Sequence, residues 1–146
     1  MQTWTNIDKS EWPEGEWQGE YDKAQWVSSG LDCLIVRGPL GALCGYVGVP
    51  ESHQYFGNHY DLPEVGVHGG LTFADKCKPL EAGDGLGVCH VEEGAANKVV
   101  WWLGFDCAHV GDANPMGMFG IKFPDETYRN IAYVQQEVER LAEQLG

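Results

Sequence analysis

Short apolar runs separated by turn residues dominate the chain before residue 108. Residues 31–37 and 42–49 are two such runs, and the Gly38-Pro39-Leu40-Gly41 stretch between them is typical of a turn. Runs of this length that are rich in Val, Ile and Leu indicate β-strands. The predicted strands are residues 31–37, 42–49, 65–73, 86–91 and 98–105. Because residues 38–41 and 92–97 suit hairpin connections, we expect a mostly antiparallel sheet of about five strands.

The C-terminal segment has a helical period. Its apolar residues recur at alternating three- and four-residue steps, and they are Tyr128, Ile131, Val134, Val138, Leu141 and Leu145. This spacing predicts an amphipathic helix over residues 125–145, with Asp125 as its N-cap. We expect the apolar stripe to pack on the sheet, because the segment is too short for a typical coiled coil.

The first thirty residues carry four tryptophans among acidic and turn residues. We expect residues 1–30 to form an irregular arm with a helical turn near residues 20–26. Its indole rings should lie against the body, since four exposed indoles would make a large apolar patch. The predicted architecture is a single α+β domain over residues 1–146, with the sheet in residues 31–107.

Composition limits the possible partners. The 146 residues carry a formal net charge of −13 with only nine Lys and Arg, so binding to DNA, RNA or anionic lipid is not expected. The acidity serves either solubility or mimicry of a polyanion. No apolar run is long enough to span a membrane, and the first residues lack the basic and apolar regions of a secretory signal.

The five cysteines lie at positions 33, 44, 77, 89 and 107. Their odd number and wide spacing argue against a disulfide scaffold and favour a reducing cytoplasm. Cys33, Cys44 and Cys89 lie in apolar runs and are expected to be small buried hydrophobes. Cys107, at the end of a predicted strand and near His109, is the better candidate for a reactive thiol.

The segment from residue 101 to residue 112 carries the main functional signal. Its apolar start belongs in a core, and Asp106, Cys107 and His109 follow at the predicted strand end. A rigid strand that ends in polar groups presents them at a cleft. We expect His68 to face the same cleft, with His68 and His109 as general acid and base and Asp106 orienting one of them.

A bound divalent transition metal is one alternative use of these groups. Its ligands would be His90 and Asp112 together with His109, which offer nitrogen and oxygen donors. The spacing matches no standard metal motif. In the competing interpretation His109 caps a turn and Asp106 accepts backbone N–H bonds.

Phosphate binding is a further possibility. Gly69 and Gly70 follow His68 and would allow close approach of the backbone to a ligand. Arg37, at the end of an apolar strand, either pairs with a carboxylate such as Asp106 or holds an anionic ligand. Arg129 is placed in the first turns of the predicted helix, where it can also reach an anion. No Walker loop or dinucleotide-binding glycine motif is present.

Aromatic side chains indicate a possible ligand-binding pocket that has no catalytic role. The residues that could stack on a planar ligand are His53, Tyr55, Phe56, His59, Tyr60 and Trp101. The same residues would equally suit an ordinary apolar core.

Several motifs together resemble a family of small proteins encoded by phages and prophages. They are residues 22–26 (DKAQW), 44–50 (CGYVGVP), 68–73 (HGGLTF), 104–109 (GFDCAH) and the stretch from Tyr128-Arg129 to Tyr133-Val134. The similarity extends from about Asp22 to Leu145, with one departure at Gln54, where relatives are expected to carry proline. It implies phage origin and action in the cytoplasm of the infected cell, and it implies no particular chemistry.

The leading hypothesis is a phage accessory protein that acts on a small, phosphate-bearing ligand of nucleotide type. Hydrolysis that counters host defence signalling is the expected reaction if the protein is an enzyme. One alternative is a sponge that sequesters the ligand, which formation of a homo-oligomer would support. The other is an acidic inhibitor of a host protein.

Overall fold

The apolar runs in the middle of the chain form the central strands of one sheet. The computed structural model describes residues 1–77, 87–90, 99–115 and 126–146. Six strands pair in the order β1-β2-β3-β4-β6-β5, and every pair is antiparallel. Their bounds are β1 Gln2–Trp4, β2 Lys23–Ser28, β3 Leu31–Arg37, β4 Leu43–Pro50, β5 Phe73–Lys76 and β6 Val100–Asp106.

Strand β3 is buried along its whole length. Cys33 and Ile35 face a core cluster shared with the helix, whereas Leu34 and Val36 face a second cluster with Tyr46 and Trp102. A strand covered on both faces needs apolar side chains at successive positions, so its sequence does not alternate.

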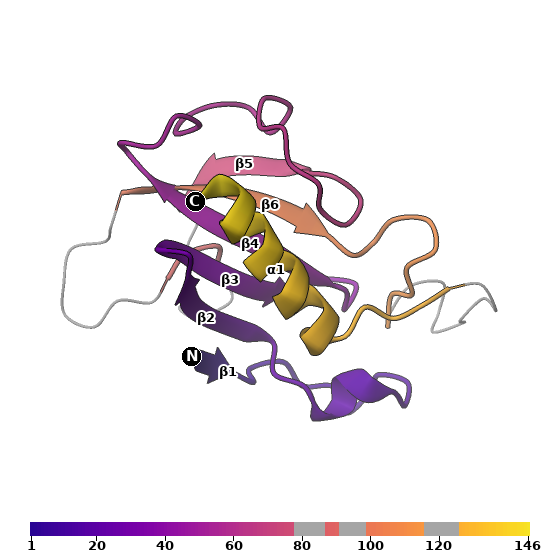
Figure 1. Ribbon diagram of the computed structural model, residues 1–146. Coiled ribbons are helices and arrows are strands. Elements are labelled where there is room, and N and C mark those ends of the chain that lie inside the picture. Colours follow the sequence, from indigo (N-terminus) through magenta and orange to yellow (C-terminus); the bar gives the residue numbers. More distant parts are fainter. Residues whose placement is uncertain (78–86, 91–98, 116–125) are drawn as a thin grey trace.

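The helix α1 (Ile131–Leu145) lies across one face of the sheet, over β3 and β4 (Figure 1). The stripe residues Val134, Val138, Leu141 and Leu145 are buried there, which confirms that this face packs on the sheet. The approach is close at Gly45, where an added Cβ would lie 2.6 Å from a methyl carbon of Val138.

The helix begins later than the sequence predicts. Asn130 is the N-cap, and its side chain accepts a hydrogen bond of 2.9 Å from the backbone N–H of Tyr133. Glu20, far away in the sequence, accepts a bond of 2.8 Å from the N–H of Ile131. Residues 126–130 are not helical, and the predicted cap Asp125 lies outside the described residues.

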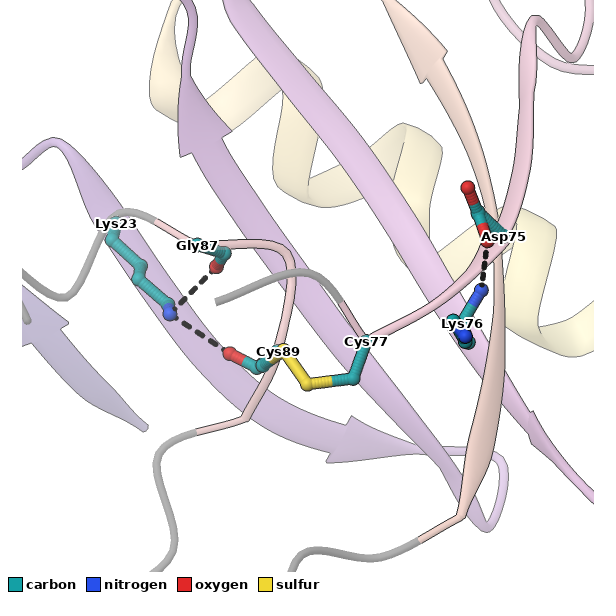
Figure 2. The surroundings of a disulfide bond; sticks show 6 residues. All are labelled: Lys23, Asp75, Lys76, Cys77, Gly87 and Cys89. Atoms are coloured by element: carbon teal, nitrogen blue, oxygen red, sulfur yellow. Dashed lines mark hydrogen bonds between the residues drawn. A yellow bond between two sulfur atoms is a disulfide. The ribbon is translucent and has the colours of Figure 1, made fainter. Parts of the chain in front are cut away.

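The second face of the sheet carries a short strap formed by residues 87–90. Figure 2 shows it on the side of the sheet away from α1, joined by a disulfide between Cys89 and Cys77, the residue after β5. Val88 packs against the second apolar cluster. The ring of His90 lies on Trp102, and His90 Nε2 is 2.8 Å from the carbonyl oxygen of Cys33.

A buried lysine also holds the strap. Lys23 Nζ donates hydrogen bonds of 2.9 and 2.8 Å to the carbonyl oxygens of Gly87 and Cys89 (Figure 2), and it lies over the ring of Trp4. Since a buried ammonium group is stable only where its charge and donors are satisfied, the strap and Lys23 depend on each other.

The disulfide corrects the cysteine prediction. Cys89 is not a free buried thiol, because it is bonded to Cys77, a residue on which the sequence argument placed no role. Cys33 and Cys107 are free and buried, and Cys44 is free and half-buried.

The N-terminal segment is tied to the sheet by a buried ionic cluster around Arg37, which is 3% exposed. Arg37 Nε donates to Asp22 at 2.8 Å, and Asp22 also accepts bonds from Lys9 Nζ at 2.7 Å and the N–H of Ile7 at 2.9 Å. Burial alone would raise the pKa of Asp22, but the bonds from Lys9, Ile7 and Arg37 outweigh it and hold the pKa below its usual value.

The remaining donors of Arg37 are engaged as well. They reach the carbonyl oxygens of Gly41 and Tyr21 and the hydroxyl of Tyr128. Tyr128 in turn donates to Glu20, the residue that also caps the helix. The cluster therefore connects the N-terminal segment, the sheet and the start of α1.

The α+β class is confirmed, and the details differ from the prediction. The sheet has six strands because residues 1–30 contribute β1 and β2, so the arm is not wholly irregular. The 3-10 turn is Glu16–Gly19, whereas residues 23–26 of the helical turn expected at 20–26 belong to strand β2. Residues 65–72 and 87–90 form no strand. Within the described ranges, no helix has the length and apolar content to cross a membrane.

We expect Asp22→Asn to lower the free energy of unfolding by about 3–5 kcal/mol, because Arg37 and Lys9 would stay buried without their anion. The stabilisation from the lowered pKa of Asp22 is present above the unfolded pKa of about 3.9 and is lost as the pH falls through the lower folded pKa. Urea unfolding from about pH 7 to about pH 2 should show a steep acid loss in the wild type and a flatter one in the variant. Glu14→Gln, at an exposed carboxylate away from this cluster, is the control and should resemble the wild type.

A second expectation concerns the disulfide. The double change of Cys77 and Cys89 to serine should lower the free energy of unfolding by about 2–4 kcal/mol, because the closed loop restricts the unfolded chain. Urea unfolding of the wild type in excess dithiol reductant should give the same loss. If neither the reductant nor the substitutions moved the unfolding midpoint, the bond would not contribute to stability.

Candidate functional site

A buried carboxylate organises the polar cluster at one end of β6. Asp112 lies in the turn after β6 and is 2% exposed. It accepts hydrogen bonds from His68 Nε2 at 2.8 Å, Arg129 Nε at 2.8 Å and the backbone N–H of His109 at 3.1 Å. Burial alone would raise the pKa of Asp112, but the bonds from Arg129, His68 and His109 hold it below its usual value, so the group is ionised at neutral pH.

His68 is held at both ring nitrogens. It lies in the connection between β4 and β5, and its backbone N–H donates to Glu137 of α1 at 2.9 Å. Nε2 meets the Asp112 carboxylate, and Nδ1 is 2.7 Å from the hydroxyl of Tyr133. An ionised carboxylate only accepts hydrogen bonds, so Nε2 carries a proton.

The hydroxyl of Tyr133 keeps its proton. Burial, and then the charge of Glu137, raise the pKa of this phenol above its usual value. Tyr133 also packs beneath the guanidinium of Arg129, which lies 5.0 Å from the ring centroid. Two residues of α1 therefore contribute to a cluster whose other members come from loops.

His109 is the more open imidazole. Its side chain is 35% exposed, and its ring centroid is 6.2 Å from that of His68. Nε2 lies 3.3 Å from Asp106 Oδ1, but the two are not aligned as a hydrogen bond, and Nε2 has no hydrogen-bond partner among the described residues. Asp106 is oriented by the hydroxyl of Thr72 at 3.1 Å and by the N–H of Ala108 at 3.0 Å.

Gly69 makes room for His109. Its φ is +68°, and an added Cβ would lie 2.4 Å from His109 Cδ2. A residue without a side chain is therefore required for the His68 loop and the His109 turn to lie this close. Gly70 also has a positive φ of +79°, but an added Cβ there would meet nothing within 4 Å.

The structure brings six of the residues singled out from the sequence into this cluster. They are His68, Gly69, Asp106, His109, Asp112 and Arg129. Arg129 lies just before the helix rather than in its first turns. Sequence reasoning missed Tyr133 and Glu137. The available signal was the spacing of Arg129, Tyr133 and Glu137 at every fourth position.

Arg37 is not a ligand-binding residue. It pairs with Asp22 rather than Asp106, and its donors are consumed by the buried ionic cluster described above. An anion would have to displace these partners in the interior, where the exchange is unfavourable.

The expected metal ligands are also separated. His90 lies on the strap against Trp102, on the sheet face away from α1, whereas Asp112 and His109 lie at the polar cluster. Among the residues that the structure describes, no three His, Cys, Asp or Glu side chains are grouped to hold a metal ion.

The aromatic residues do not form a stacking pocket in the described part of the chain. His53 Nε2 donates to the carbonyl oxygen of Leu145 at 2.7 Å at the end of α1. Trp101 donates to the carbonyl oxygen of Asn58 at 2.9 Å and so fastens the connection after β4 to β6. His59 and Tyr60 stack on each other at 4.0 Å.

The free thiols are poorly suited to nucleophilic catalysis. Burial first, and then the charge of Asp112, raise the pKa of Cys107 well above its usual value. Burial raises the pKa of Cys44 to about 11. Because the thiolate is the reactive form, neither cysteine is activated.

A surface hollow of about 580 Å³ lies at the opposite end of β6 from the polar cluster. The turn between β2 and β3, the end of β4 and Val100 line it, together with Asp32 and Glu51. None of the residues singled out from the sequence lines this hollow.

Comparison with known proteins assigns neither a family nor a function to the chain. No family model matches the chain, and neither a curated protein nor a solved structure is significantly similar to it. The resemblance to phage proteins therefore stays a prediction, and the site has to be interpreted from its own geometry.

We expect Gly69→Ala to displace the His109 ring, since the new Cβ would overlap it. Gly70→Ala is a matched control, because it imposes the same backbone strain of about 1–2 kcal/mol without the overlap. Imidazole ¹H–¹⁵N NMR should show a shifted His109 in the first variant only. Equal shifts in both variants would mean that backbone strain, and not the contact, places His109.

Proposed function

We propose that His68, His109 and Asp106 form an acid–base site for a small, phosphate-bearing ligand of nucleotide type, and that the reaction is hydrolysis. One observation carries the proposal: two imidazole rings lie 6.2 Å apart, and each faces a different carboxylate. Imidazoles exchange protons near neutral pH, and a pair in unlike surroundings suits one acid and one base.

The two rings differ in access. His109 is the group that contacts the ligand, because a third of its side chain is exposed. Its Nε2 is buried and faces Asp106, so the ring meets the ligand through its other edge, which carries Nδ1. Asp106, whose Oδ1 is 3.3 Å from Nε2, is the carboxylate that faces this ring. His68 is more deeply buried and acts through the groups bonded to it.

Arg129 holds the phosphate in this proposal and takes the part first expected of Arg37. Only Nε of Arg129 is bonded to Asp112, and within the described ranges neither terminal nitrogen has a hydrogen-bond partner. A guanidinium with two free amino groups matches phosphate oxygens in bidentate geometry. The side chain is 28% exposed, so a ligand can reach it.

Sequestration without chemistry is the second candidate. It is favoured by the two occupied nitrogens of His68, which leave that ring no lone pair for a ligand. The same residues would then bind the ligand without turning it over. The phage origin and the role against host defence signalling rest on the motif resemblance and belong to the same proposal.

A panel of nucleoside mono-, di- and triphosphates and cyclic dinucleotides tests the site. We expect release of phosphate or of an opened nucleotide, and we expect His109→Gln to lower kcat/KM by about 10²–10⁴-fold, the usual contribution of a general acid or base. His59→Gln is the matched control, since His59 also lies 3.3 Å from a carboxylate, that of Asp61, and contacts Tyr60 rather than the cluster.

Three outcomes separate the candidates. Turnover that His109→Gln removes and His59→Gln leaves intact supports the enzyme. Stoichiometric uptake of ligand that is recovered unchanged on denaturation supports sequestration. If neither variant differed from the wild type in turnover and binding, the cluster would have no role in ligand chemistry.

A further inference from the structure

A continuous chain of hydrogen bonds joins Asp112, His68 and Tyr133. The two bonds are 2.8 and 2.7 Å long, and they meet the imidazole at opposite nitrogens. In this order the carboxylate can orient the imidazole, the imidazole can act as a base, and the hydroxyl carries the proton. The sequence analysis gave no functional role to Tyr133, which lies on α1.

The direction of the second bond depends on the protonation of His68. With Nε2 protonated towards Asp112, a neutral ring accepts the Tyr133 proton at Nδ1. When the ring gains a proton, Nδ1–H donates to Tyr133 Oη instead, and the hydroxyl proton turns away from His68. Protonation of His68 therefore changes what Tyr133 Oη can offer to another group. Next to a neutral ring the hydroxyl can only accept a further hydrogen bond, and next to a protonated ring it can donate one.

The charges around His68 are consistent with this change. The Asp112 carboxylate binds the ring at Nε2, and the Glu137 carboxylate binds the backbone N–H of His68. Arg129 acts through its bond to Asp112, and the His109 ring is 6.2 Å away. Two carboxylates therefore face His68 closely, and the one nearby guanidinium is itself paired.

Tyr133 is also next to the phosphate-binding group. The Arg129 guanidinium lies 5.0 Å from the centre of its ring, and within the described ranges Oη has no hydrogen bond other than the one to His68. The raised pKa of the phenol keeps its proton available at neutral pH. A phosphate ester held by Arg129 would therefore place an ester oxygen beside a proton donor.

We infer that Tyr133 is the general acid of the site, supplied with a proton by His68, and that the substrate is a phosphate ester with a poor leaving group. This inference rests on the proposed function. Water attacks phosphorus and gives its proton to His109, while the bond from phosphorus to the leaving oxygen breaks. The leaving oxygen takes the proton of Tyr133, and the Nδ1 proton of His68 moves to Tyr133 Oη. Exchange with solvent then restores both imidazoles.

Leaving-group dependence distinguishes an acid from a structural residue. Phenyl phosphate needs a proton on its leaving oxygen, whereas p-nitrophenyl phosphate departs as a stable anion. We expect Tyr133→Phe to lower kcat/KM for phenyl phosphate by about 10²–10⁴-fold and to change that for p-nitrophenyl phosphate far less. Tyr60→Phe, at a tyrosine that stacks on His59, is the matched control and should alter neither.

Imidazole ¹H–¹⁵N NMR provides the second readout. In the resting wild type at basic pH, His68 should be the Nε2–H tautomer, and Tyr133→Phe should shift Nδ1 while leaving the tautomer and the fold unchanged. An Nδ1–H tautomer would contradict the relay.

The results separate this inference from the proposed function. Equal losses on both esters, or no loss on either, would overturn the role of Tyr133 even where His109→Gln abolishes turnover. Failure of the wild type to hydrolyse either ester, together with no turnover in the nucleotide panel, would overturn the proposed function and the relay with it.

Discussion

The structure depends on satisfying one buried guanidinium. Arg37 lies at the end of a strand that is covered on both faces, so its charge and donors must find partners inside the protein. Asp22 supplies the anion, and Tyr128 links Arg37 to Glu20. Because Glu20 also binds the first N–H of α1, the neutralisation of Arg37 fixes where the helix begins.

The candidate site depends on a second buried charge, which must also find partners inside the protein. Asp112 is ionised in the interior and takes its donors from three segments, through His68, His109 and Arg129. Arg129 follows directly after Tyr128, so the ionic cluster around Arg37 also places the guanidinium that neutralises Asp112. The two buried charges are therefore coupled through a short piece of chain, and a change in the first should be felt in the second.

The sequence correctly predicted those elements that depend on neighbouring residues. The apolar stripe predicted the buried face of α1, and the apolar run at 31–37 predicted β3, because the burial of a helix face or of a strand depends on residues that are close together in the sequence. The polar end of β6 predicted that His68 and His109 share one site, and the two rings do lie close together. Gly69 and Gly70 were expected to let the backbone approach a ligand, whereas in the structure Gly69 makes room for the His109 ring. The helix start, the partner of Arg37 and the disulfide could not be derived, since each depends on a residue distant in sequence. Tyr133 was missed because it lies outside the apolar stripe and its partner, His68, is distant in the sequence.

An anionic ligand has to approach a chain with a formal charge of −13. At physiological salt, charges beyond about 8 Å are largely screened, so most of the acidic surface acts weakly on a ligand at the cluster. The groups within contact range decide binding there, and they include one guanidinium with free amino groups, the His109 imidazole, a phenol and the Asp106 carboxylate. Recognition then depends on directed hydrogen bonds rather than on long-range attraction. Such a site selects its ligand by the geometry of phosphate and leaving oxygen.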